Sequence, residues 1–297
     1  MNILVFGGNS KLGMVFNSCF QKNNILYAVR NSKTSKLFKK KIIYNTINDL
    51  RIINAIRKAD LIVNFTGESI NNKKMIEVNI YFIKKLVELI NIHNRNCTLV
   101  HLSTCAIYQD VKKDTYLIDE NTKKIPISKY PRTKFFGEQH ILNYCKSKKI
   151  VLRPAQILGD GMSNQSLYRL KYYIEKNFFF YINDHHSLLS FTNINDVIYF
   201  FRILINKKKI IFKSINLVST IKIFDLIQII KKKYKIISFQ PTINIKFLNL
   251  LIKIFNYFGL HHPLTNQVIK SLTWKIKYSS SKVNKLFYLS KFDDVNF

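Results

Sequence analysis

The stretch Phe6-Gly7-Gly8-Asn9-Ser10-Lys11-Leu12-Gly13 follows directly on the apolar run Ile3 to Phe6. A short apolar run of this kind predicts a buried strand, and residues 12–21 have the spacing of a helix. Glycine serves such a junction because it adopts positive φ in a tight turn and lets a helix approach a strand closely. The N-terminus therefore predicts a strand, a glycine turn and a helix in direct succession.

Gly7 and Gly13 have the spacing of the outer glycines in a dinucleotide-binding loop. The exposed N–H groups of the helix that follows, beginning at Lys11 and Leu12, suit a pyrophosphate. Ser10 stands where the middle glycine is expected, and its small hydroxyl side chain is itself able to contact a phosphate. Glycines after a strand are often only turns, but the position between the first strand and the first helix favours nucleotide binding.

Farther along the chain, short apolar runs alternate with helical patterns, which is typical of a parallel sheet covered on both faces. We expect strands at residues 25–29, 42–44, 61–65, 97–102 and 150–152, and helices at 73–92 and 131–146. Residues 167–176, 195–205, 223–233 and 247–258 also have helical spacing, and 215–217 suit a late strand. The predicted fold class is α/β, a Rossmann-type doubly wound parallel sheet with a smaller C-terminal substrate-binding region. We place a dinucleotide-binding domain at residues 1–155. A mixed region at 156–297 packs on it and returns some segments to the sheet.

The composition excludes several classes of protein. With 47% apolar residues in 297, the chain can bury a full core, so it is not intrinsically disordered. Its 8 Gly, 5 Pro and 4 Cys exclude collagen-like and disulfide-scaffold classes. We expect the cysteines (Cys19, Cys97, Cys105 and Cys145) to be reduced and mostly buried in a cytoplasmic protein, and we expect no signal peptide, membrane span or metal site.

The chain carries 48 Lys+Arg against 17 Asp+Glu, a net charge of +31. The basic residues are spread over the whole length, which favours compositional bias over a groove for nucleic acid, and no zinc-finger, helix-turn-helix or RNA-sheet signature appears. A positive field still attracts anionic substrates or anionic lipid. Residues 247–260 are apolar with Lys253 as their only charge, and we favour a helix that covers the core there over one that contacts a membrane.

Arg30 follows the second predicted strand, where dinucleotide-binding folds carry the group that recognises the ribose 2′ position. An arginine with Lys33 nearby, and no carboxylate in place, suits a 2′-phosphate. This position therefore favours NADP over NAD.

Tyr130 and Lys134 are four residues apart at the start of a predicted helix, so they share a face. An ammonium beside a phenol favours the phenolate, and we therefore expect the Tyr130 pKa to be lowered toward the working pH. Such a tyrosine exchanges a proton with a carbonyl or an alcohol. Ser103 and Thr104 directly follow the predicted strand 97–102, so their hydroxyl groups stand at its carboxyl end.

Over about residues 1–220 the chain resembles an extended short-chain dehydrogenase/reductase of the NAD(P)-dependent nucleotide-sugar epimerase/dehydratase family. The similar segments occur in order: residues 7–13, 62–67, 78–80, 103–108, the Tyr130/Lys134 pair, 152–159, and 191–197 with Asp196. The resemblance implies a cytoplasmic enzyme of polysaccharide biosynthesis that acts on a nucleotide sugar. It also implies a homodimer formed through the helices at 73–92 and 131–146.

The resemblance implies that Tyr130 is the catalytic acid/base and that Lys134 binds the nicotinamide ribose and tunes Tyr130. Thr104 is implied to hydrogen-bond the reacting oxygen, with Ser103 as the second choice, and Asn79 to support the site. The implied cofactor contacts are Gly7, Ser10, Lys11, Leu12, Gly13, Arg30, Thr66 and Lys134. Asp196 we expect to be structural.

Sugar-nucleotide dehydratases of this family carry an acidic pair directly after the catalytic Thr, where this chain has Cys105 and Ala106. We therefore expect no dehydratase activity. Arg30 favours a 4-keto reductase that exchanges NADPH over a 4-epimerase that retains NAD. A non-catalytic dinucleotide sensor is the alternative from another class, although a sensor has little need of Thr104, Tyr130 and Lys134 together.

Overall fold

The computed structural model describes residues 1–30, 37–108, 117–206, 210–257, 259 and 266–295. Lys33, which entered the argument for NADP, lies outside these residues. A seven-stranded sheet has the order β3-β2-β1-β4-β5-β7-β11, and each neighbouring pair is parallel. The strands are β1 (Asn2–Phe6), β2 (Asn24–Val29), β3 (Lys41–Ile43), β4 (Leu61–Asn64), β5 (Thr98–Leu102), β7 (Lys148–Pro154) and β11 (Ser214–Leu217).

The order of the strands reverses between β1 and β4, and ligands of such sheets bind at this switch point, beyond the carboxyl ends of the strands. The prediction of a doubly wound parallel sheet is confirmed. The predicted late strand at 215–217 is β11, which joins this sheet at its edge beside β7.

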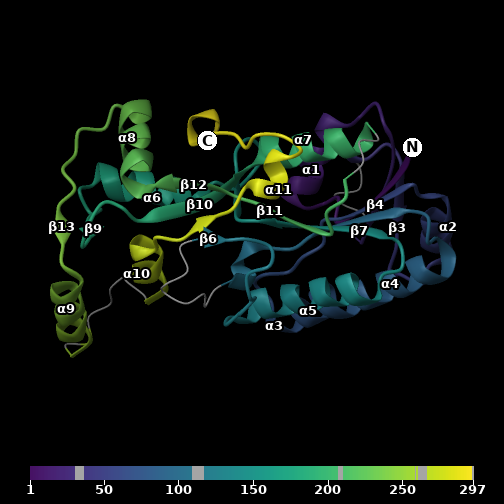
Figure 1. Ribbon diagram of the computed structural model, residues 1–297, viewed down its shortest axis with the longest axis horizontal. Coiled ribbons are helices and arrows are strands. Elements are labelled where there is room, and N and C mark those ends of the chain that lie inside the picture. The colour runs from purple at the N-terminus through teal and green to yellow at the C-terminus, as the bar shows by residue number, and fades with distance from the viewer. Residues whose placement is uncertain (31–36, 109–116, 207–209, 258, 260–265, 296–297) are drawn as a thin grey trace.

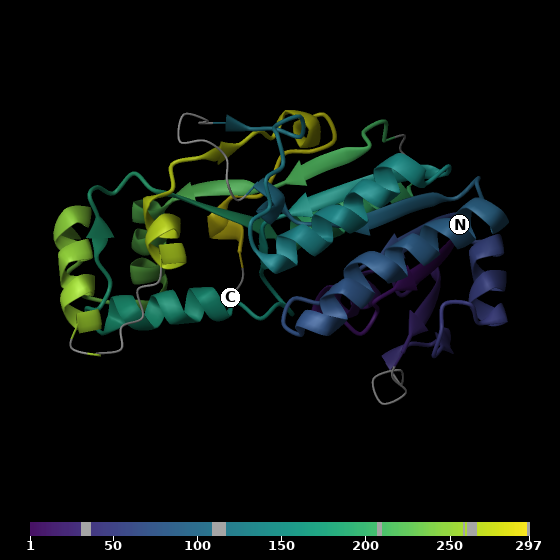
Figure 2. The same cartoon turned by 90° about the horizontal axis from the view of Figure 1, so that it is seen from below.

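Helices cover both faces of the sheet (Figure 1, Figure 2). Successive strand residues point to opposite faces. Ile3 and Val5 pack toward α1 (Lys11–Cys19) and α7 (Ile194–Ile205). Leu4 and Phe6 pack on the other side, in one core with α2 (Leu50–Lys58), α4 (Phe82–His93) and α5 (Lys129–Tyr144). Figure 2 shows α4 and α5 running side by side along the outside of the sheet.

The helix predicted at residues 73–92 is interrupted by a π-helical segment. It consists of α3 (Asn72–Ile76), the π turn η2 (Glu77–Tyr81) and α4, in direct succession. α5 passes so close to this turn that a Cβ on Gly137 would collide with the backbone carbonyl of Asn79. The predicted helix is therefore confirmed, and the π turn within it was not foreseen, because periodicity does not reveal the extra residue of a π turn.

The second half of the chain builds a smaller unit around a three-stranded sheet of β8 (Gln156–Leu158), β10 (Leu188–Asn193) and β12 (Ser219–Lys222). Helices α6 (Gln165–Glu175) and α8 (Ile223–Tyr234) pack on it. Two short strand pairs follow, β9 (Tyr181–Ile182) with β13 (Thr242–Ile243) and β6 (Leu117–Ile118) with β14 (Lys277–Tyr278). The remaining helical elements are η3 (Cys105–Tyr108), α9 (Ile245–Tyr257), α10 (Asn266–Thr273), α11 (Ser281–Asn284) and η4 (Phe292–Asp294).

Two further predictions about single residues are confirmed. Asp196 is structural: its carboxylate accepts hydrogen bonds from the Ser290 backbone N–H at 3.0 Å and from the Ser290 hydroxyl at 2.6 Å, which ties the C-terminal segment to α7. Three of the four cysteines are buried, all four are free thiols, and Cys19 is the exposed one. Within the described residues, no helix is both long enough and apolar enough to span a bilayer.

Candidate active site

The two outer glycines of the N-terminal turn are required by contacts that a side chain would break. Gly7 has a φ of 78°, and a Cβ there would lie 2.7 Å from the Thr66 backbone nitrogen. A Cβ on Gly13 would lie 2.6 Å from the Gly7 carbonyl oxygen. Real Cβ atoms do not approach backbone this closely, so β1, α1 and the segment after β4 meet only because both positions are glycine.

Ser10 replaces the middle glycine without strain, because its backbone is extended, with φ −69° and ψ 156°. It is the N-cap of α1, and its hydroxyl oxygen accepts a hydrogen bond from the Gly13 N–H at 3.0 Å. The amides of Lys11 and Leu12 belong to the first turn, which has no acceptors within its own helix. These donors and the helix dipole suit a phosphate group.

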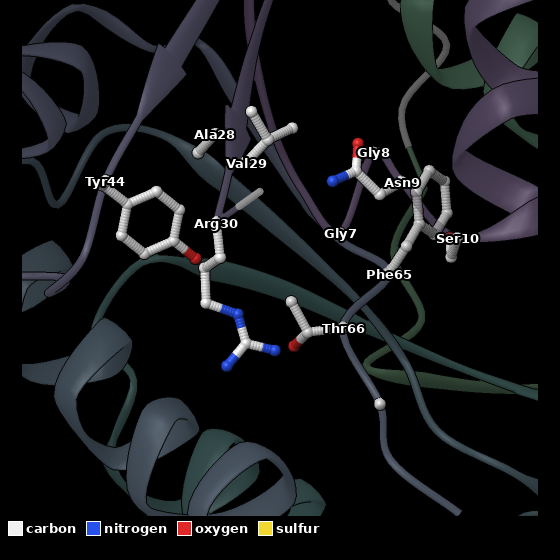
Figure 3. Close-up of a pocket in the computed structure, with 11 residues that line it drawn as sticks. Gly7, Gly8, Asn9, Ser10, Ala28, Val29, Arg30, Tyr44, Phe65 and Thr66 are labelled. Carbon is white, nitrogen blue, oxygen red and sulfur yellow. The ribbon is translucent and has the colours of Figure 1, made fainter. Parts of the chain in front are cut away.

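A cavity of about 380 Å³ opens at this turn (Figure 3). The Arg30 guanidinium extends into it toward Thr66, with the Tyr44 hydroxyl beside the arginine side chain. The Asn9 Oδ1 atom is buried without a hydrogen-bond partner among the described residues, so this acceptor remains for a ligand. The lining residues are Gly7, Gly8, Asn9, Ser10, Ala28, Val29, Arg30, Tyr44, Phe65, Thr66 and Gly67, and none of them is acidic.

Thr66 is held by a buried polar chain that sequence reasoning missed. Its backbone N–H and its hydroxyl both donate to the Asn64 Oδ1 atom, at 2.9 and 2.7 Å. The Asn64 amide then donates to His101 Nδ1 at 3.1 Å, which leaves the imidazole proton on Nε2. Burial and the charge of Lys134 lower the pKa of His101 well below its ordinary value, so the imidazole is neutral. The sequence indicates only that Asn64 and His101 lie in the predicted strands 61–65 and 97–102, and not that their side chains meet.

The Lys134 side chain approaches Gly67, one of the residues that line this cavity, from α5. Its ammonium donates to the Leu102 carbonyl at the end of β5, at 2.5 Å, and it is almost fully buried. A Cβ on Gly67, which lines the cavity, would have the Lys134 Nζ atom as its nearest neighbour at 3.8 Å. Burial lowers the pKa of Lys134 to about 8, partly opposed by the nearby Glu138 carboxylate.

Tyr130 lies one turn before Lys134 at the start of α5 and is half-buried. The expected lowering of its pKa is wrong for this structure: burial raises the pKa of Tyr130 to about 12, and the Cys105 thiol adds to the rise. Burial disfavours the phenolate because it removes the charge from water. The Lys134 ammonium, which donates to the Leu102 carbonyl, does not offset this effect on the pKa of Tyr130. The phenol is therefore protonated at neutral pH.

The segment after β5 supplies the expected hydroxyl groups. The Thr104 Oγ1 atom accepts a hydrogen bond from the Ala106 N–H at 3.2 Å at the start of η3. Within the described part of the chain, the Ser103 hydroxyl is buried without a partner. Burial raises the pKa of the adjacent Cys105 thiol to about 11, so no ionised group follows Thr104 directly.

Asn79 connects two parts of the site. Its amide nitrogen donates to the Glu68 carbonyl at 2.9 Å and to the Thr133 hydroxyl at 3.0 Å, and its oxygen accepts from the Glu68 N–H at 3.1 Å. Glu68 follows the cavity-lining Gly67, and Thr133 precedes Lys134. Asn79 therefore holds the loop after β4 against the first turn of α5.

A buried ion pair behind the site was also missed by sequence reasoning. The Arg153 guanidinium on β7 binds the Glu138 carboxylate on α5, with the shortest contact at 2.6 Å, and both side chains are almost fully buried. Arg153 also donates to the Tyr108 hydroxyl at 2.7 Å, and that hydroxyl donates to the Asn216 Oδ1 atom at 3.3 Å on β11. The pair thus joins α5 to the segment that follows Thr104.

The parallel sheet, the glycine turn and the Tyr130/Lys134 helix together define an extended short-chain dehydrogenase/reductase. Residues 1–206 match the family model described as RmlD substrate binding domain. The chain belongs to this family, and the resemblance stated from the sequence is confirmed. No curated protein sequence matches the chain at a significant level.

Solved structures share the fold at low sequence identity. A UDP-glucuronic acid 4-epimerase from Bacillus cereus, in complex with NAD, is 17% identical with a TM-score of 0.64, covering 97% of this chain and 100% of that one. A hypothetical dTDP-4-dehydrorhamnose reductase from Sulfolobus tokodaii is 17% identical with a TM-score of 0.67, covering 98% and 96%. The dTDP-4-dehydrorhamnose reductase from Yersinia enterocolitica is 18% identical with a TM-score of 0.60, covering 82% and 83%.

Proposed function

We propose that the chain is an NAD(P)-dependent oxidoreductase that exchanges hydride at a keto or hydroxyl carbon of a nucleotide-activated sugar, and that it acts as a 4-keto reductase. The proposal rests on the position of the Lys134 ammonium, which lies close to Gly67. Gly67 lines the same cavity as Gly7 and Arg30. The helix with the expected acid/base thus converges on the expected cofactor pocket. The similar reductases from Sulfolobus tokodaii and Yersinia enterocolitica accord with this proposal.

The chain's own residues suit the direction of reduction. A bound reduced nicotinamide supplies the hydride that forms the new C–H bond at the carbonyl carbon. Tyr130, protonated at neutral pH, gives its phenolic proton to the carbonyl oxygen and regains one from solvent. Thr104 or Ser103 donates a hydrogen bond to the same oxygen as negative charge develops on it. Lys134 binds the ribose of the cofactor and stabilises the transient phenolate.

The residues around the cavity fit the cofactor. The Gly7–Gly13 turn and the first amides of α1, at Lys11 and Leu12, would hold the pyrophosphate, and Thr66 would contact the cofactor from the same cavity. Arg30 would contact the ribose 2′ position of a bound cofactor, and no carboxylate is among the lining residues, which supports NADP over NAD.

The preference for NADP is tested with Arg30→Ala. We expect the KM for NADPH to rise about 10- to 100-fold, the worth of hydrogen bonds to a charged group, while the KM for NADH stays the same. Arg57→Ala, an exposed arginine on α2, is the control and leaves both constants unchanged. Equal effects of Arg30→Ala on the two cofactors would overturn the assignment of a 2′-phosphate contact.

The reaction itself is tested by mixing purified protein with NADPH and nucleotide-linked 4-keto sugars. We expect absorbance loss from the reduced nicotinamide with at least one of them, and a rate about 100- to 10,000-fold lower in Tyr130→Phe. Conversion of a UDP-hexose to its 4-epimer without net oxidation would favour the epimerase instead. Cofactor binding with neither activity would favour the sensor.

We also propose that two copies pair through η2, α4 and α5. This face carries large side chains that are more than half exposed in the single chain: Tyr81, Ile92, Phe136 and Tyr144. Sedimentation equilibrium is expected to show a dimer that Phe136→Glu weakens and that Tyr168→Glu, an exposed aromatic on α6, leaves intact. A monomeric wild-type chain would contradict the pairing.

A further inference from the structure

Helix α9 buries only one of its side chains, although it is one of the most apolar helices of the chain. Leu248 packs with Ile182 and Ile269, and Ile245 and Ile252 are partly buried against the same cluster. Most of the other side chains of the helix are exposed. Phe247, Leu250 and Ile254 are 55%, 52% and 44% exposed. Their spacing of three and four residues places them on one face. The expectation that this helix covers the core holds for one face only, where Ile245, Leu248 and Ile252 contact a small hydrophobic cluster.

The apolar face of α9 is bordered by positive charge. Lys246 and Lys253 are exposed and seven residues apart, so they lie on one neighbouring face, directly beside Phe247 and Ile254. From α8 through α9, residues 223–257 contain six lysines and one acidic residue, Asp225. An exposed apolar stripe with a border of lysines is the pattern of a helix that lies in a membrane interface.

More apolar side chains are exposed in the connection between α8 and β13, which leads into α9. Ile237 is 99% exposed and Phe239 is 76% exposed. Figure 1 shows this connection and α9 at one end of the long axis, opposite α2. Isolated exposed apolar residues are ordinary, but a group at one end of a molecule marks an interaction site.

We propose that this end, which we call the α9 tip (Phe247, Leu250 and Ile254 with Lys246 and Lys253), docks on a bilayer surface that contains anionic lipid. We favour anionic lipid as the partner because its negative charge is complementary to that of the lysines. A second copy of this tip would bring Lys246 and Lys253 close to the same lysines of its partner, because they border the apolar face. Anionic headgroups neutralise the lysines, while the interface takes up the apolar side chains.

The test is co-sedimentation of the full chain with vesicles of phosphatidylcholine alone or mixed with phosphatidylglycerol. We expect binding to the mixed vesicles only, and weaker binding at high salt. Lys246→Gln/Lys253→Gln is expected to lower the partition coefficient about 25-fold, about fivefold for each lysine near a charged surface. Phe247→Gln/Leu250→Gln/Ile254→Gln is expected to lower it at least about tenfold.

Matched controls come from the opposite end of the molecule, where Leu50→Gln and Arg57→Gln/Lys58→Gln change exposed residues of α2 and leave binding unchanged. Thermal unfolding establishes that each variant is folded. Equal binding to neutral vesicles, or wild-type binding by either α9 variant, would overturn the proposal. So would an absence of vesicle binding, and a dimer that the apolar variant dissociates would then identify the tip as a contact between copies.

Discussion

Tyr130 and Lys134 show how strongly burial sets the chemistry of single residues in this site. Their spacing was sufficient to predict that they share a helix face, but not their protonation. Burial raises the pKa of Tyr130 to about 12 and lowers that of Lys134 to about 8, so each shift favours the neutral form. The neutral phenol is a proton donor, which agrees with the direction of reduction proposed here.

The lowered pKa of Lys134 predicts a dependence of stability on pH. Between about pH 8 and the ordinary value of 10.5, the unfolded chain binds a proton that the folded chain has released. The contribution of this residue to the free energy of unfolding therefore rises with pH across that window, by up to about 3 kcal/mol, since one pH unit is worth about 1.4 kcal/mol. Chemical denaturation of the wild type and Lys134→Met at several pH values measures the difference. A difference that stays constant from pH 8 to 10.5 would contradict the shift.

At the scale of elements, the strands of the large sheet were predictable and those of the small sheets were not. The run 61–63 is continuously apolar because both faces of β4 are buried. β8, β9 and β13 have two or three residues, too few to show a period, and partners distant in sequence complete them. The π turn at Asn79 was hidden for a related reason, because its backbone is fixed by α5 across a contact that only Gly137 permits.

Gly137→Ala tests that contact between helices. The new Cβ would meet the Asn79 carbonyl, so the π turn and α5 must separate, and we expect a loss of about 1–3 kcal/mol in the free energy of unfolding. We also expect weaker cofactor binding, because Asn79 holds the loop at Glu68. Gly67→Ala is the control for stability, since its nearest neighbours lie at 3.8 and 3.9 Å. Equal stability of the two variants would show that α5 does not need the close approach.

At the scale of the whole molecule, buried charge joins parts that are distant in sequence. Arg153 binds Glu138 and Tyr108, Tyr108 reaches Asn216, and the Asn216 backbone N–H donates to Glu120 at 2.8 Å. Lys282 on α11 lies 3.6 Å from the other oxygen of Glu120. The sequence offers no signal for this network, because a lone arginine or glutamate in so charged a chain is ordinarily a surface residue.

Arg153→Met leaves the Glu138 carboxylate buried without its partner, and we expect a loss of about 3–5 kcal/mol in the free energy of unfolding. The double variant Arg153→Met/Glu138→Leu also removes the unpaired carboxylate. We expect this variant to recover much of the lost free energy of unfolding. Urea denaturation of the two variants measures both values. A double variant less stable than Arg153→Met would mean that the network contributes more than the pairing of one charge.

In the proposed reaction, hydride passes from a reduced nicotinamide to the sugar and stays there. The most direct measurement uses NADPH deuterated at the transferred position with a nucleotide-linked 4-keto sugar, followed by mass spectrometry and NMR of the product. We expect one deuterium at carbon 4 of the product for each NADPH consumed. A 4-keto sugar recovered without deuterium at carbon 4 and without oxidation of NADPH would contradict this.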